Sequence, residues 1–165
     1  MSDERELDPD SLGDHIDRLY RAAWGLCGSR EDAEDLVQET FLQVLRRPRF
    51  LRSDEDLGYL LRVLRNTFIS HGREAARRPR ETELDDDLEV AGSGGFASPE
   101  SVIETATLYG AIAELPEDFR DAVIAIDVIG LSYREAARAL QVREATVTTR
   151  LHRGRQRLAD ALRID

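Results

Sequence analysis

The chain has 165 residues, of which 41% are hydrophobic, so it is long enough for one ordinary domain or two small helical ones. No apolar run approaches the roughly 20 residues that span a bilayer. The first ten residues are acidic, unlike the start of a signal peptide. We therefore expect a globular protein of the cytoplasm that makes no contact with membranes.

Charge is distributed unevenly along the chain. The formal net charge of −10, taken alone, argues against nucleic-acid binding, because phosphate contacts need local positive charge. However, residues 81–119 contain no Arg, whereas eight Arg residues crowd the stretch after residue 130. The C-terminal part is therefore expected to carry a basic surface, separate from the acidic parts of the chain.

The sequence offers no catalytic or metal-binding constellation. Cys27 is the only cysteine, which excludes an intrachain disulfide, and its apolar neighbours favour a buried structural thiol over a redox sensor. The three histidines, His15, His71 and His152, are too scattered to form a ligand set. We find no nucleophile motif and no glycine-rich phosphate loop, so we expect no metal, no cofactor and no enzymatic activity.

Helical spacing of apolar residues predicts three helices in the first half of the chain. The first ends at Gly28, and Ser29 with Asp32 offers a capping box for the second. The third runs from near Ser53 toward Pro79. The apolar positions assigned to the core are Leu12, Ile16, Leu19, Tyr20, Ala23, Cys27, Ala33, Leu36, Val37, Phe41, Val44, Leu45, Leu57, Leu60, Leu61, Leu64 and Phe68.

A polar segment divides the chain into two parts. Residues 81–98 combine three consecutive aspartates with a Gly-Ser-Gly-Gly run, which predicts a flexible acidic linker. Helical signals resume at Ser98-Pro99-Glu100, an N-cap with proline at the first helical position. The expected fold is all-α, with two small helical domains, 11–80 and 99–163, joined by this linker.

The second domain is predicted to contain a helix-turn-helix. Ser132 and Glu135 form a capping box that opens a short helix. Residues 141–143 form a break of turn length, and a longer helix follows from Glu144 to about Leu162. This order of short helix, tight turn and longer basic helix is typical of DNA-binding domains.

The longer helix has an inner and an outer face. Val147, Leu151 and Leu158 point inward at a turn of 100° per residue. The outer face mixes hydroxyls with Arg, which suits the major groove of DNA. Its residues are Ala145, Thr146, Thr149, His152, Arg153 and Gln156, with Thr148 and Arg150 at the margins. A solvated helix of a bundle would show the same periodicity, so the pattern alone leaves both interpretations open.

Two widely separated segments together resemble the extracytoplasmic-function group (group IV) of sigma-70 family RNA polymerase sigma factors. Residues 32–41 (DAEDLVQETF) resemble region 2.2 of that family, and residues 60–66 (LLRVLRN) resemble region 2.3. Residues 115–120, 130–137 and 146–155 resemble region 4. The resemblance implies an alternative sigma factor that binds core RNA polymerase, directs it to specific promoters and promotes strand opening.

The resemblance also implies three binding surfaces. The beta-prime clamp helices of core polymerase would bind Asp35, Gln38, Glu39 and Leu42, with the beta flap as a further contact. The loop at 46–56 and the following helix would bind the melted minus-10 element through Arg49, Phe50, Arg52, Arg62, Arg65, Asn66 and Arg73. The minus-35 element would contact Arg143, Thr146, Thr148, Thr149, Arg150, His152 and Arg153. The usual regulator in this family is an anti-sigma factor that covers both domains.

The chain departs from the family pattern at three places. Arg143 replaces the usual N-cap Ser or Pro, Tyr59 replaces a common Trp, and Ser70-His71 replaces a commonly acidic position. These departures bear on promoter sequence more than on function. Residues 65–70 also resemble the general-stress-response subgroup.

Two rival functions remain open from the residues alone. One is a sigma mimic that sequesters an anti-sigma factor, and the other is a stand-alone helix-turn-helix repressor. The basic outer face of the last helix and the lack of a phosphorylation domain in this sequence disfavour the mimic. The polymerase-docking motif disfavours the repressor.

Overall fold

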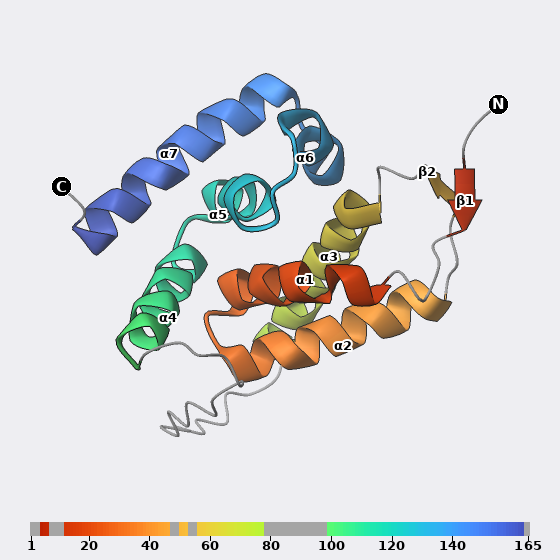
Figure 1. Cartoon of the computed structure of the whole chain (residues 1–165), viewed down its shortest axis with the longest axis horizontal. Coiled ribbons are helices and arrows are strands. Elements are labelled where there is room, and N and C mark those ends of the chain that lie inside the picture. Colours follow the sequence, from red (N-terminus) through yellow and green to blue (C-terminus); the bar gives the residue numbers. More distant parts are fainter. Residues whose placement is uncertain (1–3, 7–11, 47–49, 53–55, 78–98, 164–165) are drawn as a thin grey trace.

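The computed structural model describes residues 4–6, 12–46, 50–52, 56–77 and 99–163, most of them helical (Figure 1). The first group of helices is α1 (Leu12–Cys27), α2 (Arg30–Arg46) and α3 (Asp56–Arg77). The second group is α4 (Pro99–Ala113), α5 (Glu117–Val123), the π-helical turn η2 (Ile124–Val128), α6 (Tyr133–Leu140) and α7 (Glu144–Leu162). None of the described helices is long and apolar enough to cross a membrane. The predicted all-α fold with two helical groups is confirmed.

Two short strands accompany the helices. β1 (Glu4–Glu6) and β2 (Phe50–Arg52) pair antiparallel, with Arg5 opposite Leu51. Their pairing joins the N-terminal residues to the segment between α2 and α3. Strands of three residues are too short to show an alternating pattern, which is why the sequence predicted only a loop there.

The predicted helix ends agree with the backbone. Gly28 ends α1 with φ of +73°, a left-handed conformation that glycine adopts at little cost. The Ser29 hydroxyl accepts a hydrogen bond from the Asp32 N–H at 3.4 Å. The capping box of α6 is complete, because Ser132 Oγ accepts from the Glu135 N–H at 3.1 Å and Glu135 Oε1 accepts from the Ser132 N–H at 3.2 Å.

Most of the apolar positions assigned to the core are buried or partly buried, two are exposed, and the side chain of Leu12 lies outside the described residues. Ile16 is 44% exposed and Leu45 is 50% exposed, so their assignment to the core was wrong. Ile16 lies near the start of α1. Leu45 lies nine residues after Leu36, which places it on the opposite side of α2.

Two threonines are buried in the first group of helices although they carry a polar group. The Thr40 hydroxyl donates to the Leu36 carbonyl at 2.7 Å, and the Thr67 hydroxyl donates to the Val63 carbonyl at 2.8 Å. Each hydroxyl is thereby satisfied within its own helix, which removes most of the cost of burying it.

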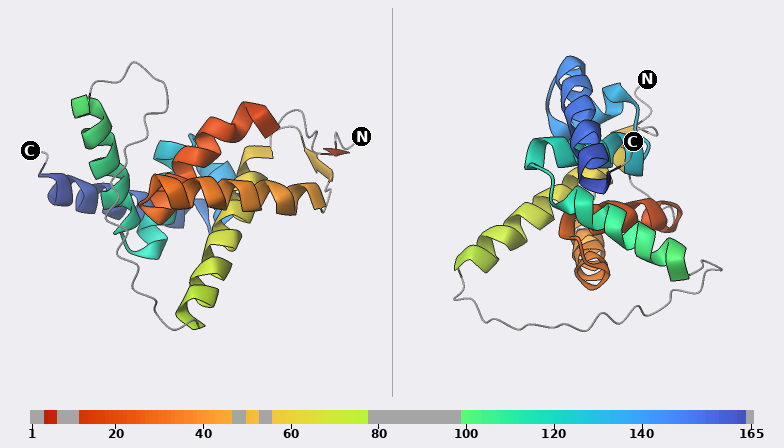
Figure 2. Two further views of the ribbon diagram at one scale, coloured as in Figure 1. Left: turned by 90° about the horizontal axis from the view of Figure 1, so that it is seen from below. Right: turned by 90° about the vertical axis from the view of Figure 1, so that its left-hand side faces the viewer.

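The two groups of helices pack against each other around one continuous core. α1 lies against α4 and η2, and α3 lies against α6 (Figure 1). The C-terminal half of α3 projects away from this body (Figure 2). The sequence predicted two domains but not their contact. The predicted linker, 81–98, lies outside the described residues.

The thiol of Cys27 is partly buried between the two groups. Burial raises the pKa of Cys27 to about 12, and Asp32 adds to this effect, whereas Arg120 lowers it. Because the thiolate is the reactive form, we expect Cys27 to react with Ellman's reagent at pH 8 on the order of a thousand-fold more slowly than in the urea-unfolded chain, where thiols ionise near pH 9.

The same shift in pKa has a consequence for stability. The folded chain holds the Cys27 proton up to a higher pH than the unfolded chain, so its contribution to stability is complete below pH 9 and is lost as the pH rises toward 12. Equal thiol reaction rates in the folded and unfolded chains would contradict this account of Cys27.

Candidate nucleic-acid interface

An exposed stripe runs along α2 on the side away from the core. Asp35, Gln38 and Leu42 are exposed on it, and Glu39 is half-buried at its edge. Leu45 continues the stripe, because the spacing of three and four residues keeps the four exposed side chains on one face. We call Asp35, Gln38, Leu42 and Leu45 the α2 stripe. Sequence reasoning missed Leu45, although its spacing of three from Leu42 could have identified it.

A groove of about 540 Å³ lies between α2 and α3. It brings together two of the residues predicted to bind the minus-10 element, Arg62 and Asn66, with Glu39 of the predicted polymerase surface. The other residues that line it are Gln43, Arg46, Tyr59 and Val63. The groove therefore combines two cationic side chains, two amides and an aromatic ring, which are the groups that bind phosphates, base edges and base faces of single-stranded DNA.

The other residues predicted to bind the minus-10 element are found elsewhere in the sequence of elements or are not described. Arg73 is exposed on the projecting half of α3, on the same side of the helix as Arg62. Phe50 and Arg52 are the two ends of β2, and Arg49 lies outside the described residues.

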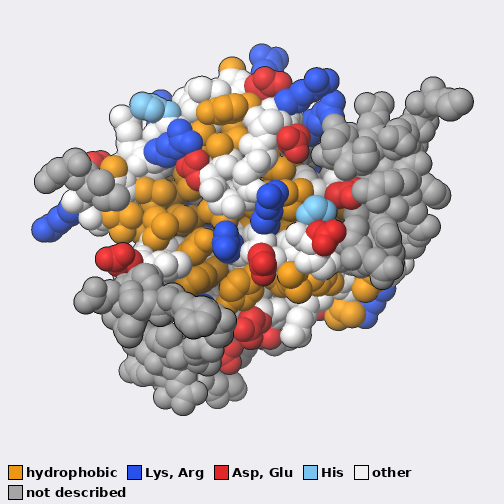
Figure 3. Space-filling view, viewed as in Figure 1, with side chains coloured by type: hydrophobic (Ala, Val, Ile, Leu, Met, Phe, Trp, Pro, Cys, Tyr) orange, Lys and Arg blue, Asp and Glu red, His pale blue; other side chains and the backbone are white. Residues whose placement is uncertain are grey.

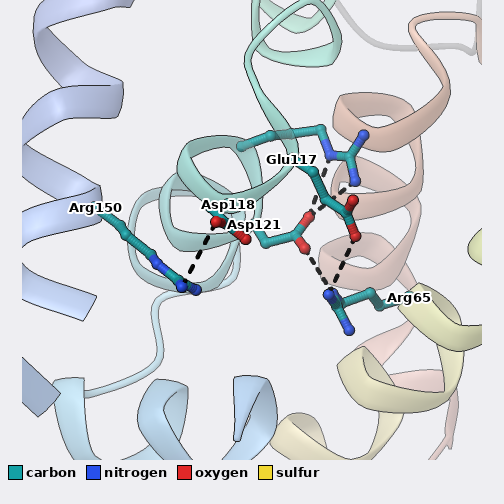
Figure 4. A network of polar contacts seen from close by, with 6 residues as sticks. Arg65, Glu117, Asp118, Asp121 and Arg150 are labelled. Atoms are coloured by element: carbon teal, nitrogen blue, oxygen red, sulfur yellow. Dashed lines mark hydrogen bonds and ion pairs between the residues drawn. The ribbon is translucent and has the colours of Figure 1, made fainter. Parts of the chain in front are cut away.

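Arg65 is turned away from the groove and toward the second group of helices (Figure 4). Its guanidinium donates to Asp121 at 2.6 Å and to Glu117 at 3.3 Å, both on α5. The structure therefore separates Arg65 from Arg62 and Asn66, with which the sequence had grouped it.

The outer face of α7 exposes Thr148, Thr149, His152 and Arg153. The hydroxyls of Thr148 and Thr149 donate to the carbonyls four residues earlier at 3.1 Å, so their methyl groups and oxygen lone pairs remain for a ligand. Such groups suit the edges and phosphates of a major groove.

Two of the other three residues predicted for the minus-35 element are less exposed. Thr146 is partly buried rather than outward, and Arg150 is partly buried beside Asp118, with 3.6 Å between its Nη2 and Oδ2 of the carboxylate. Arg143 is exposed at the N-cap of α7 and makes no side-chain capping bond there. This agrees with the missing Ser or Pro noted in the sequence.

α7 packs closely against α5 at the buried Gly154, which has no side chain. A Cβ atom at Gly154 would lie 2.7 Å from Val123 Cγ2 and 3.1 Å from the Phe119 carbonyl oxygen. The helix is also tied to η2, because Arg155 donates to both oxygens of Asp127 at 2.9 and 2.6 Å. The outer face of α7 is thereby presented on a rigid support.

Apolar side chains also reach the surface of the molecule (Figure 3). Leu108 on α4 is 39% exposed, and Ile16 near the start of α1 is 44% exposed. Among the described residues, no group of three potential metal ligands lies together.

Comparison with known proteins identifies the two groups of helices. Residues 12–78 match the family sigma-70 region 2, and residues 105–158 match sigma-70, region 4. The chain is 39% identical over 152 residues to the ECF RNA polymerase sigma factor SigE of Mycolicibacterium smegmatis, which covers 90% of this chain and 58% of SigE. This chain thus spans little more than half the length of that relative.

Other relatives match along most of their length. The chain is 30% identical to the ECF sigma factor SigM of Bacillus subtilis, covering 87% of this chain and 88% of SigM. It is 32% identical to the ECF sigma factor EcfG of Rhodopseudomonas palustris, covering 94% of this chain and 87% of EcfG.

Solved structures show the same fold. The sigma factor RpoE of Bartonella quintana, in complex with the anti-sigma factor NepR, is similar with a TM-score of 0.74 and 26% identity, covering 94% of this chain and 96% of RpoE. CnrH, in complex with the cytosolic domain of CnrY, is similar in fold with a TM-score of 0.64 and 21% identity, covering 94% of this chain and 87% of CnrH. The two matched regions and these relatives show that the chain belongs to the extracytoplasmic-function RNA polymerase sigma factors of the sigma-70 family.

Proposed function

We propose that the chain is an alternative sigma factor that acts by binding in the cytoplasm. Region 2, at 11–80, binds core RNA polymerase and the minus-10 element, and region 4, at 99–163, binds the minus-35 element, with residues 81–98 as a linker. The proposal includes no covalent chemistry, because strand opening is driven by binding energy.

The observation that supports this function best is that two different exposed surfaces occur in one chain. The α2 stripe presents one acid, one amide and two leucines, and the outer face of α7 presents hydroxyls and Arg153. A repressor needs only the second surface. A protein that recruits polymerase to DNA needs both.

The groove between α2 and α3 is the proposed site for the melted minus-10 strand. Tyr59 offers a ring on which a base can stack, and Arg46 and Arg62 offer charge for the phosphates on either side. Asn66 can hydrogen-bond a base edge. Binding an unstacked base there stabilises the open strand and so favours melting.

The outer face of α7 is the proposed reader of the minus-35 element. Arg153 and His152 donate hydrogen bonds to base edges or phosphates in the major groove, and Thr149 contacts a phosphate or a thymine methyl. The partners of the chain are then core polymerase, through the clamp helices and the beta flap, and promoter DNA.

We also propose that an anti-sigma factor regulates the chain. The sigma factor RpoE of Bartonella quintana, which has the same fold, is seen in complex with the anti-sigma factor NepR. The exposed apolar side chains of Leu108 and Ile16 suit such a protein partner.

The test is in vitro transcription with core polymerase on a library of randomised promoters, comparing the wild-type chain with Arg153→Ala. If Arg153 contacts a base, its loss should weaken transcription by roughly 5- to 150-fold, corresponding to about 1–3 kcal/mol, and relax preference at one minus-35 position. A phosphate contact would weaken all promoters alike. The minus-10 preference should stay intact.

Arg18→Ala is the matched control, because it removes the same charge from an exposed side chain of α1. Arg18 lies outside the outer face of α7, so promoter preference should not change. Absence of any polymerase-dependent transcription, or tight promoter binding by the chain without polymerase, would count against a sigma factor and for the mimic or the repressor respectively.

A further inference from the structure

A cluster of charged side chains joins regions 2 and 4 where α3 meets α5 (Figure 4). Arg65 on α3 donates from Nε to Asp121 Oδ2 at 2.6 Å and from Nη2 to Glu117 Oε1 at 3.3 Å. The other oxygen of Asp121 accepts from Arg120 Nε at 3.2 Å. One arginine of region 2 is thereby bound by two carboxylates of region 4.

Two of the four charges of this cluster are shielded from water, whereas the Arg65 side chain is 27% exposed and the Glu117 side chain is 56% exposed. Asp121 is 5% exposed and Arg120 is 8% exposed, and the Arg120 guanidinium lies 5.1 Å from the centre of the Phe68 ring on α3. Salt screens buried pairs much less than surface pairs. The contact therefore differs from an ordinary surface ion pair, which contributes little.

A second contact between the two regions, between α1 and α4, is apolar. The ring of Trp24 on α1 stacks on the ring of Tyr109 on α4, with 4.5 Å between their centroids and 17° between their planes. Trp24 is the only tryptophan of the chain. Its fluorescence therefore reports whether the two regions are in contact.

Arg65 cannot bind these carboxylates and a DNA strand in the groove at the same time, because its guanidinium lies against α5 and not among the residues that line the groove. Its two observed bonds use donors on the edge formed by Nε and Nη2. A carboxylate and a phosphate oxygen are equivalent acceptors for this edge. We call the arrangement in which Arg65 binds Glu117 and Asp121 the closed form. In the closed form Arg65 therefore cannot bind the DNA strand.

We propose that Glu117 and Asp121 are an internal competitor of the promoter strand for Arg65. In the closed form they occupy Arg65, and region 4 must move away before this arginine binds DNA. The inference rests on the proposed function, which assigns Arg65 to the minus-10 strand. Only open molecules, in which region 4 has left Arg65, bind DNA through this arginine. The measured affinity for DNA is therefore the affinity of the open form multiplied by the fraction of molecules that are open.

The test compares the full chain with the double variant Glu117→Gln/Asp121→Asn. Both changes keep the shape of the side chain and remove its charge. Binding of a fluorescein-labelled single-stranded DNA of mixed sequence, followed by anisotropy at fixed salt, should tighten about tenfold, because the open fraction rises. Trp24 emission should shift to longer wavelength as Tyr109 leaves it.

The matched control is Glu114→Gln/Asp160→Asn. It changes the net charge by the same amount, at two exposed side chains of region 4. Neither DNA affinity nor Trp24 emission should change in the control. Equal behaviour of the test and control variants would overturn the inference.

A double-mutant cycle with Arg65→Ala shows whether the effect passes through this arginine. Once Arg65 is absent, Glu117→Gln/Asp121→Asn should give no further gain in DNA affinity. A gain that persists without Arg65 would show a general charge effect and would overturn the inference. If Asp121→Asn impairs folding because Arg120 loses its partner, the single variant Glu117→Gln tests the same idea, with an expected gain of about threefold.

Failure of this inference can be told apart from failure of the proposed function. Polymerase-dependent transcription by the wild-type chain tests the function and does not depend on Glu117 or Asp121. If transcription is normal but the double variant binds DNA no better than its control, the function stands and the competitor does not. Transcription could instead be absent while Trp24 emission still shifts in the double variant. This result would support the contact of Arg65 with Glu117 and Asp121 but contradict the assignment of Arg65 to DNA.

Discussion

Replacing Asp35 and Gln38 together with alanine should lower the affinity for core RNA polymerase by about 30-fold or more, while thermal unfolding stays nearly unchanged. Both side chains are exposed on the α2 stripe, where surface substitutions usually change stability by about 0.5 kcal/mol or less. A binding loss of this size corresponds to about 2 kcal/mol, the range of an interface hot spot. Co-purification and a titration with labelled core polymerase measure it.

Asp17→Ala is the control for this variant. It removes one exposed acid from α1 and so changes the net charge by the same amount. Core binding should remain normal in the control. Normal binding by the Asp35→Ala/Gln38→Ala variant would show that the α2 stripe does not dock on polymerase. This conclusion would not depend on which residues bind DNA.

The helices and their ends could be predicted because their signals are local. The capping box at Ser132 and Glu135, the left-handed Gly28 and the start of α7 at Glu144 depend only on neighbouring residues and on the periodicity of the helix. The inward positions Val147 and Leu151 followed from the same periodicity and are buried.

The contact between the regions could not be predicted in this way. Arg65 and Asp121 are 56 residues apart, and no periodicity relates a residue of one helix to a residue of a helix beyond the linker. The sequence therefore grouped Arg65 with Arg62 and Asn66, its neighbours along α3. The structure separates them because the helix turns Arg65 toward α5.

Only some of the residues that line the groove between α2 and α3 could be singled out from the sequence. Arg62 and Asn66 were assigned to the minus-10 strand from the resemblance, and both line the groove. Tyr59 was noticed only as a departure from the family pattern, yet it supplies the aromatic ring of the groove. Gln43 was missed because its role depends on which side of α2 faces α3, and packing decides this.

Gly154→Ala should destabilise region 4 and weaken recognition of the minus-35 element. Alanine normally stabilises a helix by about 1 kcal/mol relative to glycine. Here its Cβ would lie 2.7 Å from Val123 Cγ2, in a buried and stiff side chain, and 3.1 Å from a backbone oxygen. Overpacking costs about 1–3 kcal/mol, so the steric term should exceed the gain in helix propensity and push α7 away from α5.

Gly110→Ala gives the comparison that isolates the steric effect. Gly110 lies within α4, and a Cβ there would have no heavy atom within 4 Å. This variant should therefore gain about 0.5–1 kcal/mol of stability from helix propensity alone. Urea unfolding measures the change in the free energy of unfolding, which should fall in Gly154→Ala and rise in Gly110→Ala. The randomised-promoter assay measures the minus-35 preference. Equal gains in stability at both positions would mean that α7 and α5 are not packed through Gly154, and the support of the recognition face would have to lie elsewhere.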